Sequence, residues 1–295
     1  MSDPFDPLHA LRIPLVPVTP DRIFAARLRA RLVRALLAPT QEAPMTDVLL
    51  RNELSRNGTR PGDVSYISLA VPDAARARAF YAAVLGWSYG SGQIEHEGNQ
   101  VDDVIPQVGL WPQPTTAHEP GAVLSFRVDD LPAAVAAVRA RGGTATDPVR
   151  EPFGLSADCR DDQGLEFHLH ELPQPGSLAP ANGEQQGDIS YISLQVTDPV
   201  RAHAFFGAIL GWAFSAGRSA DGANVEGPTP MIGMAATPGR PSAVLCYRVA
   251  DIADCVTRVR QAGGTATDPV QRPYAWEATC SDNQGIPFYL HQFTQ

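Results

Sequence analysis

The alternation of apolar and polar residues predicts a strand followed by a helix at the start of the patterned region. Every second side chain of YISLAV (66–71) is a large aliphatic one, which is the period of a strand with one buried face. Asp73 stands where a helix N-cap is expected, and Gly86 supplies a C-terminal stop. Between them, Phe80 and Val84 fall on one apolar side of the predicted helix.

The same order follows further along the chain. The predicted strand VLSFRV (123–128) precedes an N-cap at Asp130, and the next helix ends at the glycine pair 142–143. Two further strand candidates, LSADCR (155–160) and LEFHLH (165–170), close the unit. This order of strand, helix and strands, found twice, predicts mostly antiparallel sheets with helices on one face, which is an α+β fold.

The whole unit occurs twice. VSYISLAVPDAARARAFYAAVLGW (64–87) returns as ISYISLQVTDPVRAHAFFGAILGW (189–212), and CRDDQGLEFHLHEL (159–172) returns as CSDNQGIPFYLHQF (280–293). Similarity at this length indicates a tandem duplication. The stretch PQPGSLAPANGEQQGD (173–188) is rich in Pro, Gly and Gln, which is typical of a linker.

A basic amphipathic helix is predicted ahead of the repeats. TPDRIFAARLRARLVRALLAPT begins with a Thr-Pro cap and has an apolar residue at every fourth position, with arginines between. We expect it to dock on the acidic repeat body or on a second subunit of a homodimer, rather than on a membrane. The predicted parts are an extension at 1–60 with its helix at about 20–38, a first domain at 62–172, a linker at 173–188 and a second domain at 189–293.

Composition and charge narrow the class of protein. The chain has 295 residues, of which 44% are hydrophobic and 19% charged, as in ordinary globular proteins. Its net charge of −9 argues against nucleic acid and anionic membranes as partners, and no stretch reaches the roughly 18 apolar residues of a membrane span. The four cysteines form no CxxC pair and the N-terminus has no secretory pattern, so we expect a cytoplasmic protein with reduced thiols.

Three motifs, each present in the repeats, together resemble the vicinal oxygen chelate superfamily. They are VxDxxxAxxFYxxxLGW, VxDhxxAVxxVRxxGG and DxxGxxFxLxE. The superfamily contains glyoxalase I, extradiol dioxygenases, fosfomycin-modifying enzymes and bleomycin-type resistance proteins. The resemblance implies two tandem glyoxalase-like domains, each made of two βαβββ modules whose sheets curl into a cup. It implies less about the reaction, because one fold hosts many chemistries.

The resemblance also implies positions for a divalent metal, which superfamily enzymes bind through His, Glu or Gln. Those positions hold Tyr66, Val123 and His168 in the first repeat, and Tyr191, Val244 and Tyr289 in the second. No ligand-type residue stands at the remaining positions, around 108–110 and 232–234. Because valine cannot bind metal and a divalent site usually needs three protein ligands, the sequence predicts no metal and no cofactor, with a divalent metal as the alternative.

A rebuilt metal site on the closing strand of the first repeat is disfavoured by geometry. Glu166, His168 and His170 are expected on one face of that strand, in a spacing that metals can use. Successive side chains on one face are about 6.6 Å apart, so three of them span about 13 Å. That is too far for one ion about 2 Å from each ligand atom, unless the strand bulges.

The alternation assigns the remaining polar side chains to the cups. Arg127 and Arg248 lie near strand ends, where they are expected to be exposed ion-pair residues rather than ligand contacts, although both face the cups. His170 and His291 occupy matched positions, which suggests a shared structural role. The expected ligand-binding residues are Tyr66, Ser68, Ser125, Arg127, Glu166 and His170 in the first repeat, and Tyr191, Ser193, Gln195, Arg248, Tyr289 and His291 in the second.

Three functions fit these observations. The first is a metal-independent protein that sequesters a small, partly aromatic molecule, as resistance-type relatives do. The second is a metal-independent isomerase or cyclase of secondary metabolism, with His168 and Tyr66 as catalytic residues, because imidazole titrates near neutral pH. The third is a metal-dependent lyase or dioxygenase of the glyoxalase kind. The sequence leaves open whether the protein is an enzyme or a binding protein.

Overall fold

The computed structural model describes five stretches of the chain, all within one compact unit that begins at Ala43. The predicted N-terminal helix and linker residues 173–184 lie outside the described residues, so both stay predictions. The described stretches are 60–91, 99–112, 120–172, 185–217 and 222–293.

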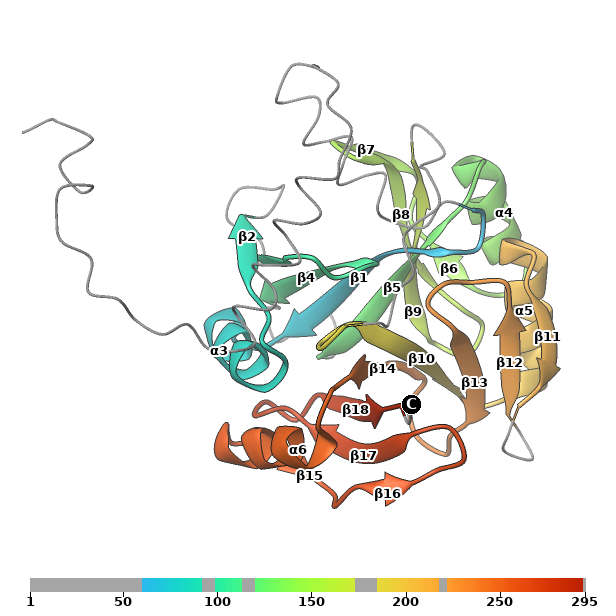
Figure 1. The fold of residues 1–295 in the computed structure, drawn as a ribbon. Helices are drawn as coiled ribbons and strands as arrows, with labels where there is room; N and C mark the ends of the chain where they lie inside the picture. Colours follow the sequence, from blue (N-terminus) through green and yellow to red (C-terminus); the bar gives the residue numbers. More distant parts are fainter. Residues whose placement is uncertain (1–59, 92–98, 113–119, 173–184, 218–221, 294–295) are drawn as a thin grey trace, which may run out of the picture. The chain divides into compact units, whose positions relative to one another are not determined.

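The first repeat follows the predicted order of strand, helix and strands, twice over (Figure 1). Its first module consists of β1 (Val64–Val71), α3 (Ala74–Leu85), β2 (Tyr89–Ser91), β3 (Asn99–Val101) and β4 (Gln107–Pro112). Its second module consists of β5 (Gly121–Arg127), α4 (Leu131–Ala140), β6 (Thr144–Ala145), β7 (Val149–Glu151), β8 (Gly154–Arg160) and β9 (Glu166–Glu171).

The second repeat has the same order of elements, as the duplication requires. Its first module consists of β10 (Ile189–Val196), α5 (Pro199–Leu210), β11 (Ala213–Ala216), β12 (Ala223–Glu226) and β13 (Ile232–Ala236). Its second module consists of β14 (Ser242–Arg248), α6 (Ile252–Gln261), β15 (Thr265–Ala266), β16 (Val270–Gln271), β17 (Trp276–Ser281) and β18 (Pro287–Gln292). The predicted α+β fold is confirmed.

The helix boundaries follow from local chemistry. The side chain of Asp73 accepts a hydrogen bond from the backbone N–H of Arg76, and Asp130 does the same for Ala133, so both predicted N-caps satisfy backbone donors that the first helical turn leaves unpaired. Gly86 ends α3 with φ of 74°, a left-handed conformation that glycine adopts without steric cost.

Strand pairing places two modules side by side in each repeat. β1 pairs in parallel with β4 and antiparallel with β5, and β5 pairs in parallel with β9, which is joined antiparallel to β8. The resulting order is β3-β4-β1-β5-β9-β8, and the second repeat has the matching order β12-β13-β10-β14-β18-β17. We call the side of each sheet that faces away from the helices its open face.

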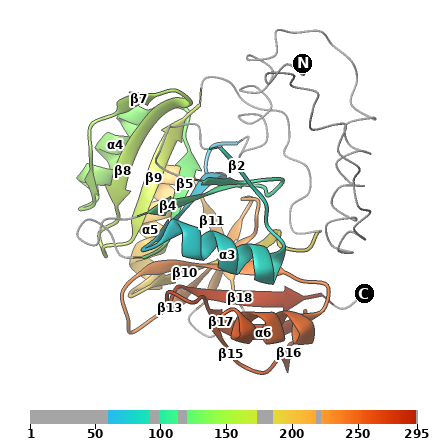
Figure 2. The same ribbon diagram turned by 90° about the vertical axis from the view of Figure 1, so that its left-hand side faces the viewer.

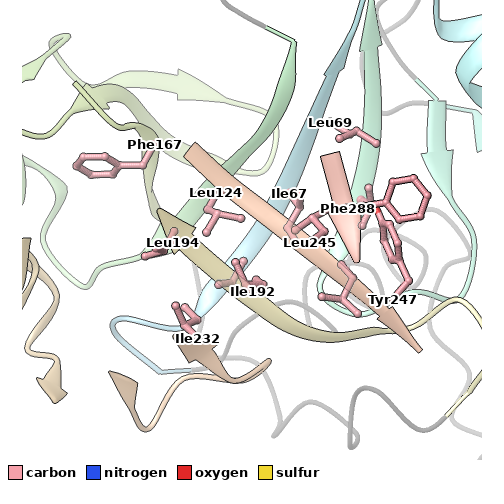
Figure 3. Packing of buried hydrophobic residues seen from close by; sticks show 14 of the residues in the cluster. Ile67, Leu69, Leu124, Phe167, Ile192, Leu194, Ile232, Leu245, Tyr247 and Phe288 are labelled. Atoms are coloured by element: carbon pink, nitrogen blue, oxygen red, sulfur yellow. The ribbon is translucent and has the colours of Figure 1, made fainter. Parts of the chain in front are cut away.

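The core is shared between the two repeats. Phe80 of α3 packs edge-on against Phe288 of β18 with ring centroids 6.1 Å apart, and Phe206 of α5 packs against Phe167 of β9 at 5.5 Å. The first helix of each repeat therefore contacts the second module of the other, and α3 lies beside α6 (Figure 2). Side chains of the central strands, among them Ile67 and Leu245, meet between the repeats (Figure 3).

Reciprocal hydrogen bonds join the repeats at the same places. The indole N–H of Trp87 donates to the carbonyl of Gly187, and that of Trp212 donates to the carbonyl of Gly62, both at 2.9 Å. Both tryptophans are core residues, since each is nearly fully buried. Buried polar groups with partners fix one packing arrangement, so these bonds set the orientation of one repeat against the other.

Candidate functional site

A β-bulge positions the first site residue. The register of β1 against β5 shifts between Val64 and Tyr66, so that Ser65 is the extra residue and Tyr66 pairs with Ser125. Ser65 is buried, and its hydroxyl donates to the carbonyl of Ser125 at 3.0 Å. The second repeat has the same register shift, with Ser190 as the extra residue.

Four side chains form a row across neighbouring strands of repeat one. Tyr66 of β1 pairs with Ser125 of β5, which pairs with His168 of β9, and His168 pairs with Asp158 of β8. Neighbouring strands lie about 4.8 Å apart, so the backbones of Tyr66 and His168 are separated by about 10 Å. The two residues predicted as catalytic therefore share one face and one row, but they are not neighbours.

The hydroxyl of Tyr66 is held by two nitrogen donors. It accepts hydrogen bonds from Nε2 of Gln100 at 3.0 Å and from Nε1 of Trp111 at 3.2 Å. Burial raises the pKa of Tyr66 to about 12, although both hydrogen bonds oppose that rise. The phenol is therefore protonated at neutral pH. It lies directly over Gly109, where an added Cβ would come within 1.8 Å of the hydroxyl oxygen.

His168 has a partner on each ring nitrogen. Nδ1 lies 3.4 Å from the hydroxyl of Ser125, and Nε2 lies 3.5 Å from a carboxylate oxygen of Asp158. The imidazole is 24% exposed while Asp158 is 66% exposed, so this pair lies at the solvent edge of the row. A carboxylate beside one nitrogen fixes the orientation of an imidazole.

The histidines at matched positions in the two repeats, His170 and His291, have different surroundings. His170 is buried, contacts the hydroxyl of Ser65 through Nδ1 at 3.2 Å, and packs against Phe153 with ring centroids 5.0 Å apart. Burial lowers the pKa of His170 to about 3, and the nearby His168 adds to this effect. His170 is therefore neutral, which suits a residue that holds the bulge.

In repeat two the matching histidine, His291, lies beside the carboxylate of Glu277. Nδ1 of His291 lies 3.2 Å from the hydroxyl of Ser190, as His170 contacts Ser65. Unlike His170, its Nε2 also lies 3.5 Å from a carboxylate oxygen of Glu277. The hydroxyl of Tyr274 donates to the same oxygen at 2.7 Å. The hydrogen bond from His291 lowers the pKa of Glu277 to about 2, and partial burial opposes that change. Strand register gives Ser156 as the counterpart of Glu277 in repeat one.

The row of repeat two lacks the polar chain of repeat one. Strand pairing aligns Tyr191, Cys246, Tyr289 and Thr279 in place of tyrosine, serine, histidine and aspartate. Tyr191 overlies Gly233 as Tyr66 overlies Gly109, since an added Cβ would come within 1.4 Å of its hydroxyl oxygen. Burial raises the pKa values of Cys246 and Tyr289, so both are protonated at neutral pH.

The charged residues predicted for the site make ion-pair or ring contacts outside the two rows. Arg127, expected at an exposed strand end, is buried, and it lies 3.6 Å from Asp129, so that expectation of exposure is wrong. It is covered because β5 is a central strand with β1 and β9 on either side. Arg248 lies over the ring of Phe293 at 5.1 Å. Glu166 makes ion pairs with Arg160 and with Arg240 of the other repeat.

The remaining predicted site residues, two serines and one glutamine, lie on the open faces. Ser68 pairs with Val123 and Gly109, and it lies two residues after Tyr66 on the same face of β1. Its counterpart Ser193 and the nearby Gln195 are partly exposed on β10. These residues stay candidate ligand contacts.

The sequence did not indicate three residues of this site, of which Asp158 completes the row and Gln100 and Trp111 hold the hydroxyl of Tyr66. Asp158 could have been found, because it alternates with the buried Ala157 and Cys159 on the strand that pairs with β9. Gln100 carries no such signal, because β3 has only three residues and its position depends on pairing with β4. Trp111 lies near the end of β4, and no spacing in the sequence indicates its hydrogen bond to Tyr66.

The residues at the inherited metal positions do not fit a divalent metal. In repeat one they are Tyr66, residues 108–110, Val123 and His168 on four adjacent strands, which leaves one imidazole as the ordinary ligand. Tyr66 is neutral and its hydroxyl fills the space above Gly109. Among the described residues, no group of three or more His, Cys, Asp or Glu side chains is arranged to hold a metal ion.

Comparison with known proteins agrees with this fold. The model of the glyoxalase-like domain matches residues 66–170 and again 191–291, together more than half of the chain. The chain belongs to the glyoxalase-like domain family. The two matched segments are the two repeats, which confirms the resemblance to the vicinal oxygen chelate superfamily that the motifs indicate. A comparison with curated proteins finds no matching sequence.

Solved structures resemble this glyoxalase-like protein over most of its length. The Mn(II)-bound glyoxalase from Novosphingobium aromaticivorans is 19% identical, with a TM-score of 0.58, covering 79% of this chain and 82% of that one. The 2,3-dioxygenase of Pseudomonas sp. KL28 is 16% identical, with a TM-score of 0.56 and coverage of 81% and 94%. Homoprotocatechuate 2,3-dioxygenase from Brevibacterium fuscum is 14% identical, with a TM-score of 0.57 and coverage of 82% and 84%. At these identities the likeness shows the fold alone.

The described part of the glyoxalase-like chain contains no helix that is both long enough and apolar enough to cross a membrane.

Proposed function

We propose that the protein binds a small, partly aromatic molecule on the open face of repeat one without a metal ion, as a sequestering protein of the resistance type. The observation that carries the proposal is the position of Tyr66 over Gly109. A ligating side chain at position 109 would have to pass through the tyrosine hydroxyl, which two nitrogen donors hold in place. On this proposal, a hydrogen-bonding centre stands where superfamily enzymes bind a metal.

Aromatic chemistry is supported by the side chains around that centre. The rings of Tyr66 and Trp111 are partly exposed beside each other, and such rings contribute large contact areas at small entropic cost. The fold neighbour from Brevibacterium fuscum was solved with 3,4-dihydroxyphenylacetate, an aromatic ligand of that protein. By analogy of fold alone, an aromatic molecule of similar size suits this chain.

Repeat one is the better candidate because its row is polar and partly exposed. His168, Ser125 and Asp158 offer hydrogen-bonding groups at the positions where repeat two has Tyr289, Cys246 and Thr279. A few placed polar groups on an otherwise apolar surface give orientation and specificity to a small-molecule site.

The test is native mass spectrometry of the purified full chain, before and after denaturation, combined with metal analysis. We expect denaturation to release an organic molecule that contains an aromatic ring, and we expect Ni, Zn, Fe and Mn to be far below one ion per chain. Stoichiometric metal would contradict the proposal and would favour a metal-dependent lyase or dioxygenase. The His168→Ala variant, purified in parallel, is expected to carry less of the molecule.

A second function, metal-independent acid–base catalysis by an isomerase or cyclase, is favoured by the contact of His168 with Asp158. A carboxylate that orients an imidazole is a common arrangement for general bases, and Tyr66 would supply a neutral O–H in the same row. Incubation of the released molecule with the protein separates the two functions. Conversion that is lost in His168→Ala identifies an enzyme, whereas unchanged recovery identifies a binding protein.

A further inference from the structure

The hydroxyl of Tyr66 has one unused hydrogen-bonding capacity, which is its own proton. A phenolic oxygen donates once and accepts through its lone pairs, and here Gln100 and Trp111 both donate to it. Within the described part of the chain, no oxygen accepts the proton of Tyr66 in return. The burial that keeps this phenol neutral also keeps the proton on the oxygen.

Gln100 contributes the opposite capacity beside it. While Nε2 of Gln100 donates to Tyr66, Oε1 of the same amide is buried and has no hydrogen-bond partner among the described residues. Buried polar atoms without a partner are rare in folded proteins, because each forfeits its hydrogen bonds to water. The network of Tyr66, Gln100 and Trp111 thus ends in one free donor and one free acceptor.

The residues that match Gln100 and Trp111 in repeat two do not supply this pair of donors. Register places Asn224 of β12 opposite Gly233, as Gln100 lies opposite Gly109, but Nδ2 of Asn224 donates to the carbonyl of Ala216 at 3.2 Å. Trp111, two residues after Gly109, corresponds to Ala235, which has no donor in its side chain. The seating of a tyrosine over a glycine is common to both repeats, whereas the pair of nitrogen donors is not.

We propose that Tyr66 and Gln100 recognise an aromatic ligand in which a carbonyl oxygen stands beside an N–H or O–H group, with Tyr66 donating to the carbonyl and Oε1 of Gln100 accepting from the neighbouring donor. Trp111 is a positioning residue, because its indole N–H holds the phenol in place. This inference rests on the proposed function and names the ligand chemistry of that site.

Two small probes of nearly equal shape test the proposal. Benzamide carries a carbonyl beside an N–H, and α-methylstyrene has a similar planar outline with neither group. Titration of the full chain is followed by the indole N–H resonance of Trp111 in ¹H–¹⁵N spectra, assigned by its loss in Trp111→Phe. This resonance reports on the hydrogen bond to Tyr66, so it responds to binding at this site and not elsewhere.

We expect the wild-type chain to bind benzamide more tightly than α-methylstyrene. Tyr66→Phe should weaken benzamide about tenfold, the size of one well-formed hydrogen bond, and leave α-methylstyrene within about twofold. Tyr274→Phe, which removes a hydroxyl that donates to Glu277 in repeat two, is the matched control and should change neither probe.

The outcomes separate this inference from the proposed function. Binding of both probes with equal affinity, or equal weakening of both by Tyr66→Phe, would overturn the recognition of a carbonyl while leaving an aromatic site in place. If neither probe bound the wild-type chain, aromatic binding on this face would itself be refuted. Thermal unfolding of each variant shows whether a loss of binding reflects a loss of folding.

Discussion

The two repeats share a backbone and differ in chemistry. Both seat a tyrosine over a glycine, and both hold a bulge with a serine and a histidine. Across the same row of strands, however, repeat one has Tyr66, Ser125, His168 and Asp158, and repeat two has Tyr191, Cys246, Tyr289 and Thr279. The shared contacts therefore identify what maintains the fold, and the unshared ones identify where function has diverged.

The matched histidines show the difference most clearly. His170 is buried against Phe153 with a serine hydroxyl as its polar partner, whereas His291 has both a serine and the carboxylate of Glu277. The same backbone position thus holds a neutral imidazole in one repeat and an imidazole beside a carboxylate in the other. An identical residue at a matched position does not guarantee an identical electrostatic environment.

The largest expected effect tests this contrast through pH. The pKa of His170 is about 3 in the folded chain and near 6.5 when unfolded, so between these values the unfolded state binds a proton that the folded state excludes. Stability is then full above about pH 6.5 and falls by up to about 1.4 kcal/mol per pH unit as pH drops toward 3. In His170→Gln this pH-dependent part of the free energy of unfolding should vanish, which urea unfolding at pH 4, 5, 6 and 7 will measure. Parallel curves for the variant and wild type would contradict a neutral buried His170.

The next effect tests the tyrosine–glycine contact in both repeats. Gly109→Ala should destabilise folding by about 1–3 kcal/mol, because the new Cβ overlaps the hydroxyl of Tyr66. Adding Tyr66→Phe removes that oxygen and leaves Nε1 of Trp111 at 2.9 Å and ring carbon Cζ at 3.0 Å, so part of the stability should return. In repeat two, Cζ of Tyr191 would still lie at 2.5 Å, so Tyr191→Phe should rescue Gly233→Ala less well. Equal rescue in the two repeats, measured by chemical denaturation, would remove this difference between them.

A smaller effect tests whether one repeat is the functional one. His168→Ala should weaken binding of the co-purified molecule about fivefold by isothermal titration calorimetry, since a partly exposed hydrogen-bonding group contributes roughly 1 kcal/mol. Tyr289→Ala changes the matched position of repeat two and should have little effect. Similar losses in the two variants would mean that the site is not confined to repeat one.

The sequence predicted those features that depend on local pattern. The duplication, the caps at Asp73 and Asp130, and the shared face of Tyr66 and His168 all follow from spacing along the chain, and the structure agrees with each. The family's metal positions could also be located, because each is a fixed number of residues from a cap or turn.

What the sequence could not supply depends on contacts between distant strands. The hydrogen bond from Gln100 to Tyr66 requires the pairing of the three-residue strand β3 with β4. Arg127 was expected to be exposed because it ends its strand, yet neighbouring strands cover it. The packing of Phe80 on Phe288 joins opposite ends of the chain, and no periodicity within one repeat reveals it.

The exchange of first helices between the repeats bears on how such a chain arose. A lone repeat would leave Phe126 and Phe167 without the helix that covers them, so the smallest stable unit is a pair. An ancestral chain of one repeat would then have folded as a two-fold symmetric dimer with two identical sites. With both repeats in one chain that symmetry no longer constrains the sites, because a substitution in one repeat does not appear in the other. The polar row of repeat one and the altered row of repeat two are what such a release permits.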